Sequence, residues 1–171
     1  MVEYLGIDES HISEHVHVYV GVPSNEEVSC RKKQLGKTRG SLQYSRLCNL
    51  DFRFVVVRDW HLHHVPFHVA QSAAHATLIQ FFNPTSVFID GKRIEKHARA
   101  LEERLHKESE IDIHYIRKGD KKIPLINQAD HLAYLLRRHF EIYGYFARWA
   151  QGKELLPLPF EYSNLFVASN Q

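Results

Sequence analysis

Three segments in the first sixty residues carry the hydrophobic pattern of β-strands. Residues 2–8 are largely apolar, residues 15–23 alternate histidine and tyrosine with valine, and residues 51–59 are rich in valine and phenylalanine. A period of two with β-branched and aromatic residues is typical of strands. Because the connection between the first two segments is short, we expect these strands to pair antiparallel, with the third extending the same sheet.

The spacing of apolar residues becomes helical after residue 66. Residues 67–82 and 92–108 place apolar side chains three and four residues apart, and a long amphipathic segment covers residues 124–149. Short apolar segments at residues 85–91 and 111–120 separate these helices and are predicted to be strands. Alternation of helix and strand indicates parallel pairing through right-handed crossovers.

These elements predict an α/β fold. We expect a mixed five-stranded sheet with its first three strands antiparallel and helices on both faces. The length of 171 residues suits a single domain, with a core at residues 1–150 and an irregular, proline-containing tail at residues 151–171. A short further helix is expected around residues 41–49.

Composition narrows the class of protein only partly. Hydrophobic residues make up 44% and charged residues 25%, which is typical of a soluble globular protein. No apolar run approaches the roughly 20 residues that span a bilayer, so no membrane partner is expected. The two cysteines suit a reducing compartment, and we predict a cytoplasmic protein. The formal net charge of +2 does not by itself indicate nucleic-acid binding, although residues 31–40 form a basic cluster.

Acidic residues follow several of the predicted strands. Asp8 and Glu9 end the first strand, Asp90 ends the fourth, Asp120 follows the fifth, and Asp130 lies at the margin of the apolar face of the last helix. Neighbouring parallel strands end at the same edge of a sheet, where open α/β sheets place their sites. Clustered carboxylates repel one another unless cations bridge them, and oxygen ligands suit Mg²⁺ or Mn²⁺. The acids therefore predict a metal-dependent phosphodiesterase with a two-metal mechanism.

The order of these motifs resembles the ribonuclease H fold, and two families within it in particular. The motifs LGIDES, VFIDGK and RKGD resemble the strand-Asp-Glu, strand-Asp-Gly and Lys-Gly-Asp motifs of type 2 ribonuclease H, and HATLIQFF is similar to a helix of that family. An uncharacterised ribonuclease-H-like family starts with Asp-Glu-Ser and has a final helix of the form Gln-x-Ala-Asp-x-x-Ala, which NQADHLAYLLRR resembles. The resemblance extends from residue 4 to about residue 140.

Both resemblances imply a nuclease that uses Mg²⁺ or Mn²⁺ and takes RNA, DNA or a hybrid as its substrate. Asp8, Glu9 and Asp90 match catalytic metal ligands in both families. The families differ over the fourth acid, which is Asp120 by the type 2 pattern and Asp130 by the other. Helix geometry favours Asp130 over Asp120, and both remain candidates.

The chain departs from type 2 ribonuclease H directly after Glu9. Those enzymes continue with a Gly-Arg-Gly stretch that reads the ribose 2′-hydroxyl, whereas residues 10–13 here are SHIS. Recognition of a ribonucleotide within DNA is therefore not implied. Near the acids, His11 is a candidate proton shuttle, and Lys92 and Lys118 are candidate phosphate-binding residues.

Two other functions compete with a nuclease. The first is a non-catalytic nucleic-acid-binding module on the same fold, since the charge is balanced and Gly-Arg-Gly is missing. The second is a zinc protein built on the histidine-rich segment 61–68, although no cysteine pair accompanies it. Aromatic residues near the end of the last helix are expected to serve helix packing rather than to form a base-stacking platform: Tyr143, Tyr145, Phe146 and Trp149.

Overall fold

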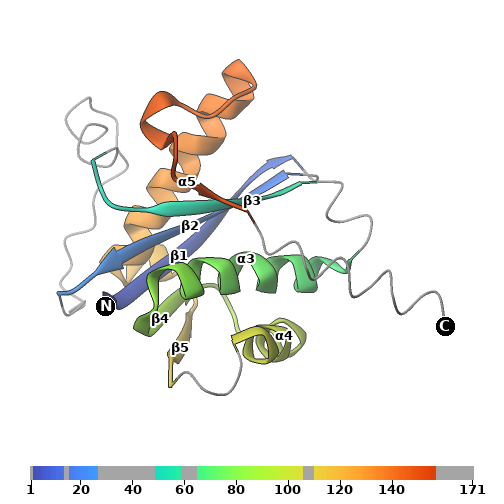
Figure 1. Cartoon of the computed structure of the whole chain (residues 1–171), viewed down its shortest axis with the longest axis vertical. Helices are drawn as coiled ribbons and strands as arrows, with labels where there is room; N and C mark the ends of the chain where they lie inside the picture. The colour runs from blue at the N-terminus through green and yellow to red at the C-terminus, as the bar shows by residue number, and fades with distance from the viewer. Residues whose placement is uncertain (1, 14–15, 27–48, 59–64, 106–109, 157–171) are drawn as a thin grey trace.

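The computed structural model describes residues 2–13, 16–26, 49–58, 65–105 and 110–156 (Figure 1). The strands of this part of the chain are β1 (Val2–Ser13), β2 (Val16–Ser24), β3 (Arg53–Arg58), β4 (Pro84–Asp90), β5 (Asp112–Ile116) and β6 (Glu154–Leu155). Its helices are α3 (Phe67–Phe82), α4 (Glu95–Leu105) and α5 (Pro124–Tyr143), with the short 3-10 helices η1 (Gly119–Lys121) and η2 (Arg148–Ala150).

The strands form one mixed sheet in the order β5-β4-β1-β2-β3-β6. β1, β2 and β3 pair antiparallel, whereas β4 pairs parallel with β1 and β5 pairs parallel with β4. The predicted α/β fold, with its first three strands antiparallel, is confirmed. The sheet has six strands rather than five in the described residues, because the two residues of β6 pair with β3. A strand that short has no hydrophobic period to read.

β1 is longer than its hydrophobic pattern predicts. It continues to Ser13, because residues beyond Asp8 keep pairing with β2, including His11 with His17. Its pairing with β4, by contrast, reaches only Ile7 opposite Ile89. Asp8 therefore marks the point where β1 leaves β4, not the point where the strand ends.

The last helix is shorter than predicted. α5 ends at Tyr143 instead of residue 149, and Gly144 follows it with a φ of 75°. A left-handed residue after a helix is usually glycine, because a Cβ is strained there. Beyond this point the chain turns back, and Phe146 packs on Phe54 with ring centroids 5.1 Å apart.

Two hydrophobic cores lie on opposite faces of the sheet. On one face, α3 and α4 cover Leu5 and Ile7 of β1. On the other face, α5 crosses β1 and β2 and packs on valines of β2 and β3 (Figure 1). The predicted arrangement of helices on both faces is confirmed.

Gly6 lets α5 approach β1 closely. A Cβ at Gly6 would lie 2.5 Å from the Cβ of Leu125 and 2.9 Å from the backbone nitrogen of Ile126. A side chain of any size there would push the helix away from the strand. The glycine therefore sets how near the first turn of α5 comes to the middle of β1.

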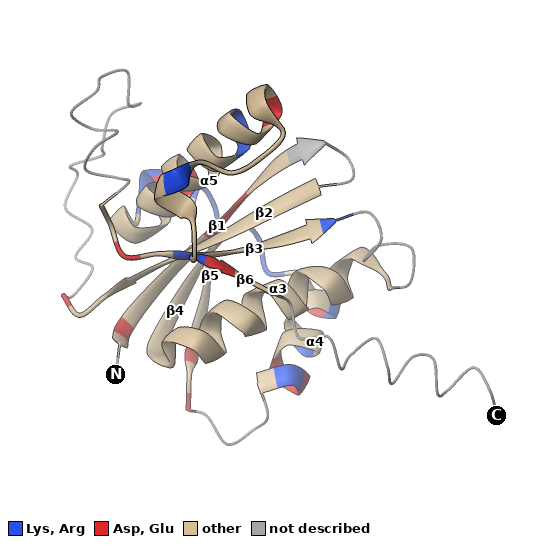
Figure 2. Cartoon of the chain, turned by 45° about the horizontal axis from the view of Figure 1, so that its top comes forward, with Lys and Arg blue, Asp and Glu red and all other residues tan. Residues whose placement is uncertain are grey.

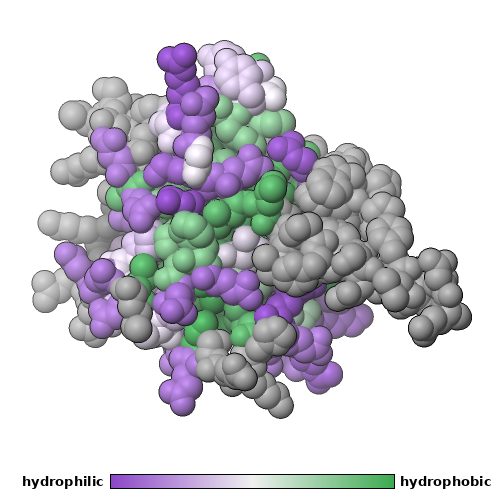
Figure 3. Space-filling model, viewed as in Figure 1, coloured by the Kyte–Doolittle hydropathy of each residue, from purple (hydrophilic) through white to green (hydrophobic). Residues whose placement is uncertain are grey.

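Some predicted features lie outside the described residues: the helix over residues 41–48, the basic segment 31–40, residues 61–64 of the histidine-rich segment, and residues 157–171 of the tail. Within the described residues, no helix combines the length and apolar character needed to cross a bilayer. The described surface in Figure 3 mixes hydrophilic side chains with smaller hydrophobic areas.

Candidate functional site

Strand alternation places the candidate acids on different faces of the sheet. Residues two apart in a strand share a face, so Asp8 points to the same side as Gly6, toward α5. In β4, Val87 and Ile89 belong to the core under α3, which places Asp90 on the α5 side. Glu9 follows Leu5 and Ile7 on the α3 side. Figure 2 shows the acidic stretch of β1 running beneath α5.

Asp8 and Asp90 come together because β1 and β4 are parallel neighbours. Ile7 and Ile89 are partners in the register, and each acid is the next residue of its strand. Burial raises the pKa of Asp8 to about 8. The backbone N–H of Glu9 donates to Asp8 Oδ1 at 2.7 Å and opposes this shift, whereas the charges of Asp90, Asp130 and Glu9 add to it. Asp8 therefore keeps its proton at neutral pH when no cation is bound.

Asp130 joins this group from the second turn of α5. Burial raises the pKa of Asp130, and the nearby charges of Asp120 and Asp90 raise it further. His131 and Arg137 oppose the shift. Asp8 therefore lies in the electrostatic field of Asp90 and Asp130, and Asp130 lies in that of Asp90 and Asp120, so that ionising Asp8 and Asp130 is unfavourable without a cation.

The turn after β5 is held directly against Asp90. The backbone N–H of Gly119 donates to Asp90 Oδ1 at 2.5 Å. A Cβ at Gly119 would lie 2.5 Å from Cδ1 of Ile126 and 2.9 Å from Asp90 Oδ1, so a larger residue would force both side chains to shift. Lys118, just before it, has a φ of 55°, which is uncommon for a residue other than glycine. The turn thus brings Lys118 and Asp120 to the same edge of the sheet as Asp90.

Glu9 is held by polar groups on the α3 side. Gln71 donates from Nε2 to Glu9 Oε2 at 3.3 Å, and His11 Nε2 lies 3.7 Å from Glu9 Oε1. The buried hydroxyl of Tyr19 has no hydrogen-bond partner of good geometry within the described part of the chain, although it lies close enough to Glu9 to interact with its carboxylate. Burial, and then the charge of Glu9, raises the pKa of Tyr19 well above its usual value. Glu9 is thus near Asp8 but is oriented by a different set of side chains.

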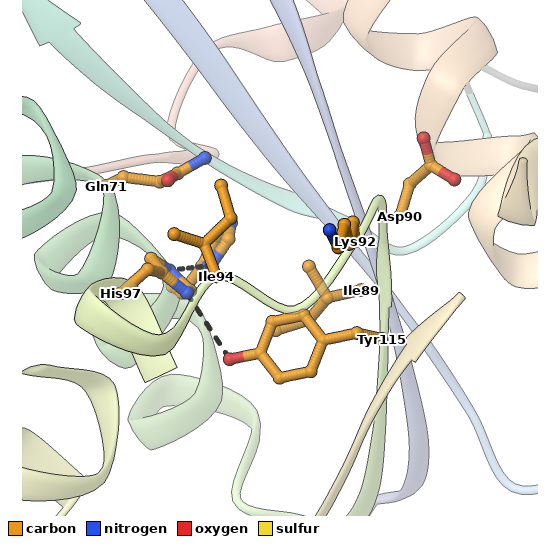
Figure 4. Close-up of a pocket in the computed structure, with 8 residues that line it drawn as sticks. Gln71, Ile89, Asp90, Lys92, Ile94, His97 and Tyr115 are labelled. Carbon is orange, nitrogen blue, oxygen red and sulfur yellow. Dashed lines mark hydrogen bonds between the residues drawn. The ribbon is translucent and has the colours of Figure 1, made fainter. Parts of the chain in front are cut away.

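A chain of polar side chains on the α3 side was missed by sequence reasoning. His75 Nδ1 bonds to His97 Nε2 at 2.9 Å, and His97 Nδ1 bonds to the hydroxyl of Tyr115 at 3.3 Å (Figure 4). Burial lowers the pKa of His75 well below its usual value and that of His97 to about 4, so both rings are neutral at pH 7. Single histidines on two separate helices carry no sequence signal that they will meet.

These histidines line a small pocket beside Asp90. Lys92 borders the pocket after Gly91, which has a φ of 110°, and water can enter about 40 Å³ of it. In Figure 4 the Asp90 carboxyl group points away from the pocket, toward α5. Lys92 is exposed and lies at the rim between the two faces.

The residues have the donor chemistry of a Mg²⁺ or Mn²⁺ site. Carboxylate oxygens are the ligands that these hard cations prefer, and a cation would offset the repulsion that raises the pKa of Asp8. Among the described residues, no three His, Cys, Asp or Glu side chains are already grouped closely enough to hold an ion. Asp8, Asp90 and Asp130 thus have the right ligand atoms and lie near one another, but their carboxylates do not converge on a single point.

The aromatic residues after α5 divide into two pairs. Phe146 packs on Phe54, and Trp149 packs on Phe52 with ring centroids 5.8 Å apart, so both rings serve packing inside the protein. Tyr143 and Tyr145 are instead 57% and 62% exposed. Both rings pack on His139 of α5, with ring centroids 4.6 Å and 5.4 Å from it, because α5 ends at Tyr143 and leaves them at its tip.

Comparison with known proteins identifies the fold. RNase HII from Archaeoglobus fulgidus, solved in complex with PCNA, matches with a TM-score of 0.60 and 21% identity, over 99% of this chain and 90% of that chain. Ribonuclease H2 from Pyrococcus horikoshii matches with a TM-score of 0.60 and 13% identity, over 98% and 86%. Bst-RNase HIII in complex with Mn²⁺ matches with a TM-score of 0.58 and 14% identity, over 85% and 56%. No protein-family model matches the sequence, and a search of curated proteins finds no significant match. The chain therefore has a ribonuclease H-like fold, as its motifs predicted.

Proposed function

We propose that the protein is a divalent-metal-dependent nuclease that hydrolyses a phosphodiester bond of a nucleic acid. The observation that carries this proposal is the meeting of Asp8, Asp90 and Asp130, from β1, β4 and α5, with the pKa of Asp8 raised to about 8. Buried acids that repel one another at a sheet edge are costly unless a cation offsets them. The similarity in fold to RNase HII, and to an RNase HIII solved with Mn²⁺, supports the same chemistry.

The position of each acid and lysine at this sheet edge would set its role in the reaction. Asp8, Asp90 and Asp130 hold Mg²⁺ or Mn²⁺, and Glu9, at the same level of β1, is a further ligand from the α3 side. Such cations activate water and neutralise charge on the phosphate during an in-line displacement. A cation held there would favour the ionised carboxylate of Asp8, because it would offset the electrostatic penalty on that group. Lys118 and Lys92, on either side of Asp90, bind phosphate oxygens.

Asp130 is favoured over Asp120 as the fourth acid. The carboxyl of Asp130 extends from a helix that Gly6 holds close to β1, whereas Asp120 lies in the turn of η1. The side-chain Nδ2 of Asn127 donates to the backbone carbonyl of Asp120 and so fixes the turn rather than the carboxyl. A packed helix holds a ligand more precisely than a loop does.

A substrate screen tests this function. Labelled single-stranded RNA, single-stranded DNA, RNA–DNA hybrid and duplex DNA are incubated with the protein in Mg²⁺, Mn²⁺, Ca²⁺ or EDTA, and products are resolved on a gel. We expect cleavage of at least one substrate in Mn²⁺ or Mg²⁺ and none in EDTA. Asp8→Asn should remove this cleavage, whereas Asp51→Asn, a control at an exposed acid of another edge, should not. Cleavage that persists in EDTA, or in Asp8→Asn, would contradict the proposal.

The second candidate is a nucleic-acid-binding module without catalysis. It is favoured by the absence, among the described residues, of three metal-ligating side chains already grouped around one point. In that case the protein should bind nucleic acid in EDTA, fail to cleave any of the four substrates, and show no heat of Mn²⁺ binding by calorimetry. Metal binding with cleavage supports the nuclease, and binding of nucleic acid alone supports the module.

A further inference from the structure

A row of aromatic rings crosses the sheet on the same face as Asp8 and Asp90. Tyr4 of β1 stacks on Phe88 of β4 with centroids 6.4 Å apart and planes 29° apart. Phe88 stacks on His114 of β5 with centroids 5.1 Å apart and planes 18° apart. Strand alternation places Phe88 on this face, since it is two residues before Asp90. We call Tyr4, Phe88 and His114 the aromatic ladder.

The ladder lies on a part of the sheet that α5 leaves largely uncovered. α5 packs mainly on β1 and β2, whereas β4 and β5 lie to the other side of β1. β5 is the edge strand of the described sheet, so His114 ends the row and has no further strand beside it. The side chain of His114 is 42% exposed, and its Nε2 lies 3.5 Å from Asp112 Oδ2. Among the described residues, Phe88 is the ring that stacks on His114, and the exposed part of the imidazole can contact another flat ring.

The ladder is close to the acidic group. Phe88 and Asp90 are two residues apart on one strand face, which corresponds to about 7 Å along β4. Tyr4 and Asp8 share a face of β1 at twice that separation. A chain of nucleotides that passes the acids can therefore place a neighbouring base on the ladder.

Basic residues follow the ladder at the end of β5. Arg117, Lys118, Lys121 and Lys122 are exposed around the turn that Gly119 fixes to Asp90. Since β5 runs parallel to β4, this turn lies at the same sheet edge as the acids. Stacking rings beside cations are the two elements by which proteins bind single-stranded nucleic acids.

We propose that the aromatic ladder and the turn after β5 bind a single-stranded nucleic acid. An unpaired base stacks on His114 and continues the row, while phosphates contact Lys118 and its neighbours. A base within a duplex already stacks on its own neighbours, so the ladder selects unpaired strands. This inference rests on the proposed function for the idea that the bound strand is also cleaved, but the binding itself needs no metal.

Fluorescence anisotropy with the full chain in EDTA tests the binding. The probes are a labelled 12-nucleotide oligo(dT), oligo(rU) and a 12-base-pair duplex. His114→Ala and Phe88→Leu should each weaken single-strand binding by about 10-fold, as expected for the loss of one stacking contact, with little change for the duplex. His114→Tyr should retain the affinity if stacking is the cause. His139→Ala and Phe81→Leu are matched controls, because His139 and the 49% exposed Phe81 lie away from the ladder, and both should bind like the unaltered protein.

The salt dependence of binding tests the basic turn. Lys118→Gly keeps the left-handed backbone and removes the charge, so log Kd should depend less steeply on log salt by about one phosphate contact, a slope of roughly 0.7. Single-strand affinity unchanged in His114→Ala and Phe88→Leu would overturn the proposal. The proposal would also be overturned if His114→Ala and Phe88→Leu changed the sedimentation of the free protein but not its binding of single strands. The ladder would then contact a second copy of this chain. Single-strand binding without cleavage would refute the nuclease alone, and cleavage unaffected by the ladder variants would refute this inference alone.

Discussion

The buried polar groups on the two faces of the sheet differ in whether they repel or hydrogen-bond one another. On the α5 face, Asp8, Asp90 and Asp130 repel one another, and the pKa of Asp8 rises to about 8. On the α3 face, His75, His97 and Tyr115 form a chain of hydrogen bonds between neutral groups. Only the first arrangement is relieved by adding a cation. The comparison therefore separates a group of acids that needs a ligand from a polar cluster that is satisfied by its own partners.

The largest expected effect is the loss of catalysis in Asp90→Asn. The change keeps the shape of the side chain, and the asparagine oxygen can still accept the Gly119 N–H, but one of the proposed metal ligands is lost. Replacing a residue that only orients a metal ligand typically costs about 10- to 100-fold in activity. We expect the loss of a ligand to cost more, so cleavage should fall by more than about 100-fold. Thermal unfolding without metal should occur at the same or a slightly higher temperature, since one repelling charge is gone. Full activity in this variant would place catalysis elsewhere.

Asp130→Asn and Asp120→Asn, compared in the same assay, decide which acid is the fourth ligand. We expect Asp130→Asn to lower metal-dependent cleavage by orders of magnitude and Asp120→Asn to lower it little, in both Mg²⁺ and Mn²⁺. The reason is that Asp130 lies on a packed helix next to Asp8, whereas Asp120 acts on the group from the η1 turn. An inactive Asp120→Asn beside an active Asp130→Asn would reverse the assignment.

The pH dependence of stability tests the raised pKa of Asp8 on the α5 face. The pKa of Asp8 is about 8 in the folded protein and 3.8 ordinarily, so between these values the folded state holds a proton that the unfolded state has released. Metal-free stability should therefore fall as pH rises from about 4 to 8, by at most about 1.4 kcal/mol per pH unit from this group. Denaturant unfolding across this pH range measures the slope. Asp8→Asn should flatten it, and a slope unchanged by Asp8→Asn would show that Asp8 does not hold this proton.

A smaller effect concerns how tightly each helix layer approaches the sheet. Gly6→Ala places a Cβ against the backbone of α5, which cannot yield locally, and should cost about 1–3 kcal/mol of unfolding free energy. Gly21→Ala on the α3 face meets Cδ1 of Leu5 and Cδ2 of Leu78, each at 3.3 Å, and Cε2 of Phe82 at 3.5 Å; these are side-chain ends, and the two leucines can shift. We expect a lower cost there. Gly6→Ala should also reduce cleavage, because it moves Asp130 away from Asp8, and equal stability of the two variants would contradict this view.

Local patterns in the sequence determined most of the secondary structure and part of the acidic site. A period of two in β2 and a helical period in α5 depend on residues close in the chain, so the type of each element can be read directly. The position of Asp8 and Asp90 on neighbouring strands followed from parallel pairing, which alternation of helix and strand implies. Glu9 lies on the other face by the same period of two, since adjacent strand residues point to opposite sides.

The remaining features depend on contacts between distant residues, which only the tertiary structure decided. The hydrogen bond between His75 and His97 joins two helices, and the aromatic ladder joins three strands, so neither has a sequence spacing of its own. The close approach of Asp130 to Asp8 depends on the packing of α5 against Gly6. Each of these contacts results from the register and packing of whole elements, and those are set by the total burial of both cores rather than by any short stretch of residues.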